Sequence, residues 1–217
     1  MQRPTVDEES RLWAAGYRAV AGVDEAGRGA WAGPVVAAAV ILPPDLAALC
    51  SQSPWTAVAD SKLLSPAQRE ALYPAILAAA RSVGVGMASA RRIDAVGILQ
   101  ATREAMLAAL SALDSPPDFV LVDHVALSDA PAPHRALVKG DRRVLSIAAA
   151  SVVAKVVRDR WMAQLDPRFP AYGFGRHKGY GTPGHRDALM RLGPCPEHRR
   201  SFAPVQSAVA APDAARP

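Results

Sequence analysis

The sequence predicts an α/β protein in which helices flank a single β-sheet. Apolar runs of strand length alternate along the chain with longer segments of helical pattern, and this alternation is typical of that class. The chain has 217 residues, of which 50% are hydrophobic and 21% are charged. A chain of this length buries enough apolar surface to fold without disulfides or a structural metal. We therefore expect one domain over residues 1–204.

The strands are predicted from short apolar runs at 19–24, 35–42, 83–89 and 119–123. The run from Val35 to Leu42 is apolar throughout, as expected of a strand that is buried on both faces. The fourth run begins just after Pro116 and Pro117, which end the preceding helical pattern.

The helices are predicted at 7–17, 65–82, 98–113, 144–165 and 183–192. The second begins with Ser65-Pro66-Ala67-Gln68, a capping serine followed by proline and by glutamine at the third position. Thr182 and Pro183 give the last helix a similar start. The segments 43–59 and 126–134 are expected to be loops, and the Ala- and Pro-rich tail at 205–217 to be disordered.

The composition indicates the oxidation state of the cysteines and the cellular compartment of the protein. Cys50 and Cys195 lie far apart and have no neighbours at zinc-site spacing, so we expect reduced thiols. No apolar run approaches the length that crosses a membrane, and acidic residues stand where an export signal would be basic. The expected location is the cytoplasm.

Positive charge is concentrated in the C-terminal third. The formal net charge is +5, and residues 135–200 hold 14 Lys and Arg against 5 Asp and Glu. Such a region suits a nucleic-acid phosphate backbone, and we expect 135–204 to contribute to substrate binding. A charge distribution that merely keeps the protein in solution remains the alternative.

Four carboxylates stand at the ends of predicted elements. Asp24 and Glu25 stand together where the first strand ends, Asp123 ends the fourth, and Asp141 comes just before the longest helix. Carboxylate oxygens are the ligands that Mg²⁺ and Mn²⁺ prefer, and two such ions can clamp a phosphoryl group. The alternative is that these residues cap loops or pair with arginines.

Several short segments of the chain form a recognisable set: Gly22–Gly29 with Ala32–Ala37, Asp60-Ser61-Lys62, Val120–Asp123, Lys139-Gly140-Asp141, Ala148–Ser151 with Ala154-Lys155 and Arg158-Asp159, His177–Tyr180, and His198–Phe202. In these segments, and in their order over residues 20–204, the chain resembles the ribonuclease HII family. Two departures are visible: His124 stands where the family usually has Gly, and residues 173–176 vary a segment that is often richer in His and Lys.

The resemblance implies a ribonuclease H-like fold with a single mixed sheet and a helical C-terminal region. It implies an endonuclease that cuts the RNA strand of RNA–DNA hybrids and nicks 5′ of single ribonucleotides in duplex DNA, leaving 3′-hydroxyl and 5′-phosphate ends. By family position, Asp24, Glu25 and Asp123 are ligands of Mn²⁺ or Mg²⁺, and Asp141 is the fourth catalytic carboxylate. The related ribonuclease HIII has an additional N-terminal domain, for which the segment before residue 20 leaves no room.

The expected substrate-binding residues lie in the matching segments: Gly27, Arg28, Gly29, Lys62, Ser151, Lys155 and Tyr180. Lys155 has an alternative as a simple i,i+4 ion pair with Asp159, and Tyr180 as a half-buried core residue. We expect Arg199 and Arg200 to be solvated, and His177 and His185 to lie at the surface or near phosphates.

Two other functions remain open. A DNA nuclease or resolvase would use the same carboxylates without regard to the 2′-hydroxyl, and a silent hybrid-binding module would bind without cutting. The expected partners are RNA–DNA hybrid and ribonucleotide-containing duplex DNA. No sequence feature indicates a protein partner, an oligomer or a membrane, so a monomer is expected.

Overall fold

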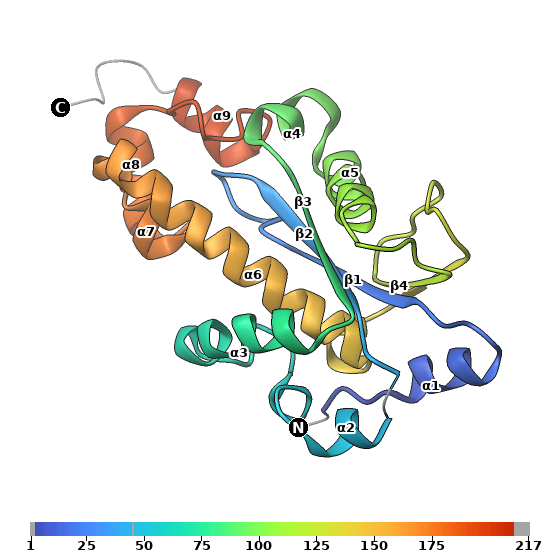
Figure 1. Cartoon of the computed structure of the whole chain (residues 1–217). Coiled ribbons are helices and arrows are strands. Elements are labelled where there is room, and N and C mark those ends of the chain that lie inside the picture. Colours follow the sequence, from blue (N-terminus) through green and yellow to red (C-terminus); the bar gives the residue numbers. More distant parts are fainter. Residues whose placement is uncertain (1–2, 45, 211–217) are drawn as a thin grey trace.

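A five-stranded mixed sheet forms the centre of the protein in this computed structural model, which describes residues 3–44 and 46–210 (Figure 1). Its strands are β1 (Val20–Ala26), β2 (Val35–Ile41), β3 (Ser82–Ala88), β4 (Phe119–Asp123) and β5 (His134–Leu137), and their order across the sheet is β3-β2-β1-β4-β5. The pairs β1–β2 and β2–β3 are antiparallel, whereas β1–β4 and β4–β5 are parallel. The predicted fold class, a single mixed sheet flanked by helices, is confirmed.

Helices cover both faces of the sheet (Figure 1). One apolar layer joins the sheet to α5 (Ile98–Ser111), and the other joins it to α6 (Leu145–Leu165) and α3 (Pro66–Ala79). The remaining α-helices are α1 (Asp7–Ala14), α2 (Leu46–Ser51), α4 (Ala90–Val96), α7 (Phe174–His177), α8 (Pro183–Leu192) and α9 (Ala203–Ala210). Short 3-10 helices occur at Trp55–Ala57, Gly140–Arg142, Asp166–Arg168 and Pro170–Tyr172. In the described part of the chain, no helix is long and apolar enough to cross a membrane.

The start of α6 lies directly on strand β1. A Cβ atom at Gly22 would overlap main-chain atoms of Ser146 and Ile147, so only glycine permits this approach. Small residues on α6, including Ala148 and Ala149, are fully buried against the sheet. This contact brings the residues that precede α6 close to the end of β1.

Most predicted elements are found close to their expected bounds. All seven residues of β2 are buried, which explains its continuous apolar run. The capping box is present at α3, where Ser65 accepts from the Gln68 main chain and Gln68 accepts from the Ser65 main chain. That helix ends at Ala79, earlier than predicted, because Ser82 already belongs to β3.

Two predictions about irregular segments were wrong, and a third was confirmed. The loop expected at 43–59 contains α2 and a 3-10 helix. The loop expected at 126–134 is irregular up to Pro133, and β5, a strand that the sequence did not predict, begins at His134. The tail expected to be disordered from 205 is helical to Ala210, because Val205 and Ala208 pack against Leu189 of α8. Residues 211–217 lie outside the described part.

Candidate active site

Three carboxylates converge beside the central strands. Asp24 lies on β1, Asp123 ends β4, and Asp141 lies in the 3-10 helix before α6; one oxygen atom from each lies within 4.8 Å of the others. Strands β1 and β4 are parallel neighbours, with Val23 opposite Val122. Asp24 and Asp123 therefore follow paired residues and share the face of the sheet that α6 covers.

Main-chain donors and one lysine hold these carboxylates. The N–H of Glu25 donates to Asp24 Oδ1, and the N–H of Gly140 donates to Asp123 Oδ1, both over 2.7 Å. Lys62 Nζ donates to Asp141 Oδ2 over 3.1 Å, while its side chain is 73% exposed. Lys62 thus contacts the carboxylate cluster from the solvent side.

Burial and mutual repulsion make the cluster costly to ionise. Asp24 is 4% exposed, and burial followed by the charges of Glu25 and Asp123 raises its pKa well above the ordinary value. Burial and the charge of Asp141 likewise raise the pKa of Asp123. Partial burial acts to lower the pKa of Lys62, but its hydrogen bond to Asp141 and the charges of nearby aspartates together outweigh this, so the net shift is upward.

Glu25 lies outside the tight group of three. The sequence predicts that the first strand ends at Asp24, but β1 continues to Ala26, so the side chains of Asp24 and Glu25 lie on opposite sides of the sheet. Glu25 Oε1 accepts from Arg28 Nη1 over 3.2 Å, and its buried Oε2 has no hydrogen-bond partner. Burial raises the pKa of Glu25, and Asp123 adds to the shift while Arg28 opposes it.

This donor set fits a divalent cation. The described groups offer three converging carboxylates, and a fourth, Glu25, lies close enough for its charge to raise the pKa of Asp24. Buried carboxylates without matching cations are expensive unless a metal neutralises them. The chemistry of the donors therefore favours Mg²⁺ or Mn²⁺ over the softer metals.

Ser151 is buried and acts on the loop that bears Lys62. Its hydroxyl accepts from the Ser61 N–H over 3.2 Å and donates to the Ala148 carbonyl over 2.9 Å. Asp60, also buried, accepts from the Lys62 N–H over 2.9 Å and from Arg142 over 3.1 Å. Ser151 thus positions the segment 60–62 and has no hydroxyl proton left for a ligand.

The predicted glycine-bearing segment forms a tight turn directly after β1. Gly27 has a φ of +94°, which disfavours any residue with a side chain. A Cβ there would also overlap the guanidinium of Arg158. Gly29 is exposed, with open space where a Cβ would lie. We call residues 27–29 the glycine turn; Gly27 is buried in it, Arg28 is half-buried, and Gly29 is exposed.

Tyr180 lies in a loop, as its flanking glycines predicted. Its ring is half-buried, with Arg158 5.2 Å and Lys155 Nζ 5.5 Å from the ring centre. Lys155 also donates to Asp159 over 2.7 Å, which is the simple i,i+4 pair considered as its alternative. The two interactions coexist, so Lys155 connects Tyr180 to the surface of α6.

Sequence reasoning missed the buried cations and histidines behind these segments. Arg158 and Arg199 are fully buried, contrary to the expectation that Arg199 is solvated. His185 is also fully buried, because its ring joins that of His198 through Nε2 atoms 3.0 Å apart. For Arg158, His198 and Arg199, their positions within the matched family segments were the only available signal; His185 lies outside those segments and had none.

His124, the departure from the family pattern, has a φ of +56°. That conformation is one that glycine adopts freely and other residues at a cost. The glycine that the family usually carries there therefore suits the backbone just after Asp123.

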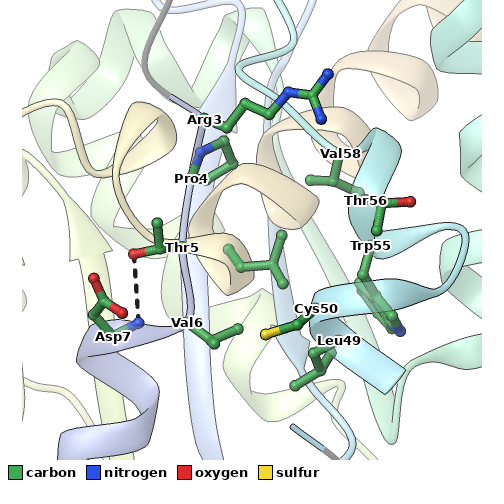
Figure 2. Close-up of a pocket in the computed structure, with 11 residues that line it drawn as sticks. Arg3, Pro4, Thr5, Val6, Asp7, Leu49, Cys50, Trp55, Thr56 and Val58 are labelled. Carbon is green, nitrogen blue, oxygen red and sulfur yellow. Dashed lines mark hydrogen bonds between the residues drawn. The ribbon is translucent and has the colours of Figure 1, made fainter. Parts of the chain in front are cut away.

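A separate cavity of about 340 Å³ lies between the N-terminal segment, α2 and the start of α6 (Figure 2). Arg3, Val6, Cys50, Trp55 and Leu145 are among its lining residues. No carboxylate of the cluster lines it, so this cavity is not the active site.

A mixed sheet that brings buried carboxylates together, in a chain whose C-terminal third is basic, is typical of a metal-dependent hydrolase of phosphodiesters. The family model described as ribonuclease HII matches residues 21–205, and the chain belongs to that family. The protein is accordingly a metal-dependent nuclease of the ribonuclease H type.

Individual relatives agree with this assignment. A ribonuclease HII of Roseiflexus castenholzii is 56% identical over 202 residues, covering 93% of this chain and 89% of the relative. The ribonuclease HII of Geobacillus kaustophilus is 54% identical over 203 residues, covering 94% and 75%. The crystal structure of ribonuclease H2 from Pyrococcus horikoshii is similar with a TM-score of 0.72 at 26% identity, covering 88% and 97%. A complex of PCNA with ribonuclease HII from Archaeoglobus fulgidus contains a chain with a TM-score of 0.65 at 30% identity, covering 79% and 85%.

Proposed function

We propose that this protein hydrolyses the RNA strand of RNA–DNA hybrids and also nicks duplex DNA on the 5′ side of single embedded ribonucleotides. The products are 3′-hydroxyl and 5′-phosphate ends. The observation that supports this proposal best is the contact between the carboxylates and the glycine turn: Glu25 follows Asp24 and accepts from Arg28. Cleavage and sugar recognition would then occur within a few residues of one another.

Asp24, Glu25 and Asp123 would hold the divalent ions, either Mg²⁺ or Mn²⁺, and Asp141 would complete the catalytic carboxylates. Two bound ions supply a clamp on the attacking and leaving oxygens of an in-line phosphoryl displacement. Gly140 orients Asp123 through its N–H, and Lys62 orients Asp141. The exposed Lys62 ammonium can also meet a substrate phosphate at the rim.

The substrate side would be formed by the glycine turn, Lys62, Lys155 and Tyr180, with Ser151 acting through the loop that it supports. Discrimination of RNA from DNA requires a group that meets the 2′-hydroxyl. Main-chain groups of Gly27, Arg28 and Gly29 can approach a sugar closely because the glycines lack side chains. The Tyr180 ring offers a flat surface for the following sugar.

A cleavage assay with matched duplexes tests the proposal. A DNA duplex with one ribonucleotide, an all-DNA duplex and a long hybrid are incubated with Mg²⁺, with Mn²⁺ or with a chelator. We expect metal-dependent cutting of the hybrid and of the single-ribonucleotide duplex only. Equal cutting of all-DNA would support a DNA nuclease or resolvase, and binding without cutting under either metal would support a silent module.

The role of Tyr180 has its own test. Tyr180→Ala should reduce cleavage at a single embedded ribonucleotide more than cleavage within a long hybrid, where the next sugar also carries a 2′-hydroxyl. Tyr180→Phe keeps the ring and should retain most of the preference if packing against the sugar is what matters. Equal losses on both substrates would assign Tyr180 to general binding or folding.

We further propose that the protein acts as a monomer in the cytoplasm without an obligatory protein partner. The Archaeoglobus relative forms a complex with PCNA, but the tail 205–217 of this chain lacks an aromatic-ended segment of the kind that docks on sliding clamps. A single peak of monomer mass in light scattering is expected, and a stable dimer would refute it.

A further inference from the structure

Two fully buried arginines lie behind the glycine turn. Arg158 donates to the carbonyls of Pro34, Ala32 and Lys178 over 2.9–3.1 Å. Arg199 is equally inaccessible. Within the described chain, neither guanidinium has a carboxylate within ion-pair distance. Such unpaired buried charge is costly, so these residues need an explanation other than simple packing.

Arg199 holds the glycine turn through main-chain carbonyls. Its Nη1 donates to the carbonyl of Arg28 over 2.8 Å, its Nε donates to that of Gly33 over 3.0 Å, and its Nη2 has no partner. Burial, followed by the charge of Arg158, lowers the pKa of Arg199 to about 9. The residue thus keeps its fixed position at an electrostatic cost.

The bond to the Arg28 carbonyl fixes the direction of the next N–H. In a trans peptide the C=O and the N–H point in opposite directions. The carbonyl of Arg28 faces buried Arg199, so the N–H of Gly29 faces away from it. Gly29 is exposed, has open space around its Cβ position, and its N–H finds no acceptor in the described residues.

We propose that Arg199 is a positioning residue that aims the Gly29 N–H at the 2′-hydroxyl of the substrate ribonucleotide. A cation on the carbonyl side also polarises the peptide, which strengthens its N–H as a donor. The inference rests on the proposed function, because it assumes that the glycine turn meets the ribose. It adds a buried residue, remote from solvent, that sets sugar specificity through the backbone.

Binding measured without turnover tests this role. The full-length protein is titrated in Ca²⁺ against two fluorescent DNA duplexes that differ only by one ribonucleotide, and the ratio of the two Kd values gives the ribose preference. We expect Arg199→Gln to lose about tenfold of that preference while its Kd for all-DNA stays within about twofold. Arg199→Lys keeps the charge but loses the two-carbonyl fork, so it should fall between the wild type and Arg199→Gln.

Asp94→Asn is the matched control. Asp94 accepts from the N–H groups of Arg200 and Ser201 over 2.9 and 2.8 Å, so it anchors the same segment. It does not hydrogen-bond the Arg199 guanidinium, although its charge is the smallest of the influences that shift the pKa of Arg199. We expect a lower Tm and an unchanged ribose preference. If Arg199 had only a structural role, an Arg199 variant and Asp94→Asn that share the same Tm would also share the same ribose preference.

The outcomes separate the inference from the proposed function. A wild type that neither prefers nor cuts the ribonucleotide duplex refutes the proposed function, and the inference with it. A wild type that prefers ribose while both Arg199 variants keep that preference refutes the inference alone. Equal weakening on both duplexes also refutes it. If Arg199→Gln does not fold, Arg199→Lys decides: a wild-type ratio overturns the proposal.

Discussion

Replacing Asp24 by Asn should stabilise the metal-free protein while removing its response to metal. Asp24 is buried, and its pKa is raised, first by desolvation and then by neighbouring carboxylates. A carboxyl with a raised pKa in the folded state holds its proton there more tightly than in the unfolded chain. The contribution of Asp24 to folding stability is therefore fully present below its ordinary pKa of 3.8, and it is lost as the pH rises through the raised pKa.

Asparagine removes that penalty because it carries no charge. Each unit of pKa shift corresponds to about 1.4 kcal/mol, and each kcal/mol moves the Tm of a protein of this size by about 2–4 °C. We therefore expect a metal-free Tm several degrees above the wild type near pH 8, with the difference shrinking as the pH falls. The Oδ1 contact with the Glu25 N–H survives, since an amide oxygen accepts as well.

The assay is thermal unfolding from pH 5 to pH 9, in a chelator and again in Mg²⁺ or Mn²⁺. Metal at about 100 times its Kd stabilises a folded protein by about 2.7 kcal/mol, so wild type should gain and Asp24→Asn should not. Asp129→Asn, at an exposed aspartate of the β4–β5 connection, is the control and should match wild type in both conditions. A less stable metal-free Asp24→Asn, or one that still gains Tm with metal, would refute the reasoning.

Three further predictions concern other parts of the molecule. Glu25→Gln should lower cleavage by orders of magnitude with an unchanged circular-dichroism spectrum, and near wild-type rates would remove it from the essential set. Gly22→Ala should cost about 1–3 kcal/mol or more in urea unfolding, because its Cβ overlaps the Ser146 backbone. Burial lowers the pKa of His185 and of His198 from 6.5 to about 4, so stability should fall as pH drops from 6.5 towards 4, by about 3 kcal/mol for one such group. His185→Gln should flatten that pH profile, and an unchanged slope would contradict the assignment.

The strands and helices with strong local signals could be predicted from the sequence. Strand β2 is buried on both faces and reads as an unbroken apolar run, and α3 carries its start in the Ser65–Gln68 motif. Strand β5 has no such signal. Its central residues Arg135 and Ala136 are exposed, and the strand exists because its main chain pairs with β4.

The sequence predicts the carboxylates of the candidate site, but not the residues that hold the surrounding backbone in place. Asp24 and Asp123 each follow an apolar run, and adjacent parallel strands bring such positions together. The different placement of Glu25 depends on how far β1 stays paired, which the sequence does not reveal. Arg199 reads as a surface charge beside Arg200, because its acceptors are main-chain carbonyls that only the tertiary fold supplies.

The two costly features of the fold lie on opposite sides of the glycine turn. On one side, buried carboxylates repel one another, and on the other, Arg158 and Arg199 lack anionic partners. Moving these groups together as ion pairs would relieve both costs, yet the turn lies between them, and its Arg28 donates to Glu25 on the carboxylate side. A divalent cation would neutralise the first group, and a sugar–phosphate laid across the turn would bring negative charge to the second. Each half of the site is therefore stabilised by a different part of the catalytic complex, so metal alone and nucleic acid alone should each raise the Tm.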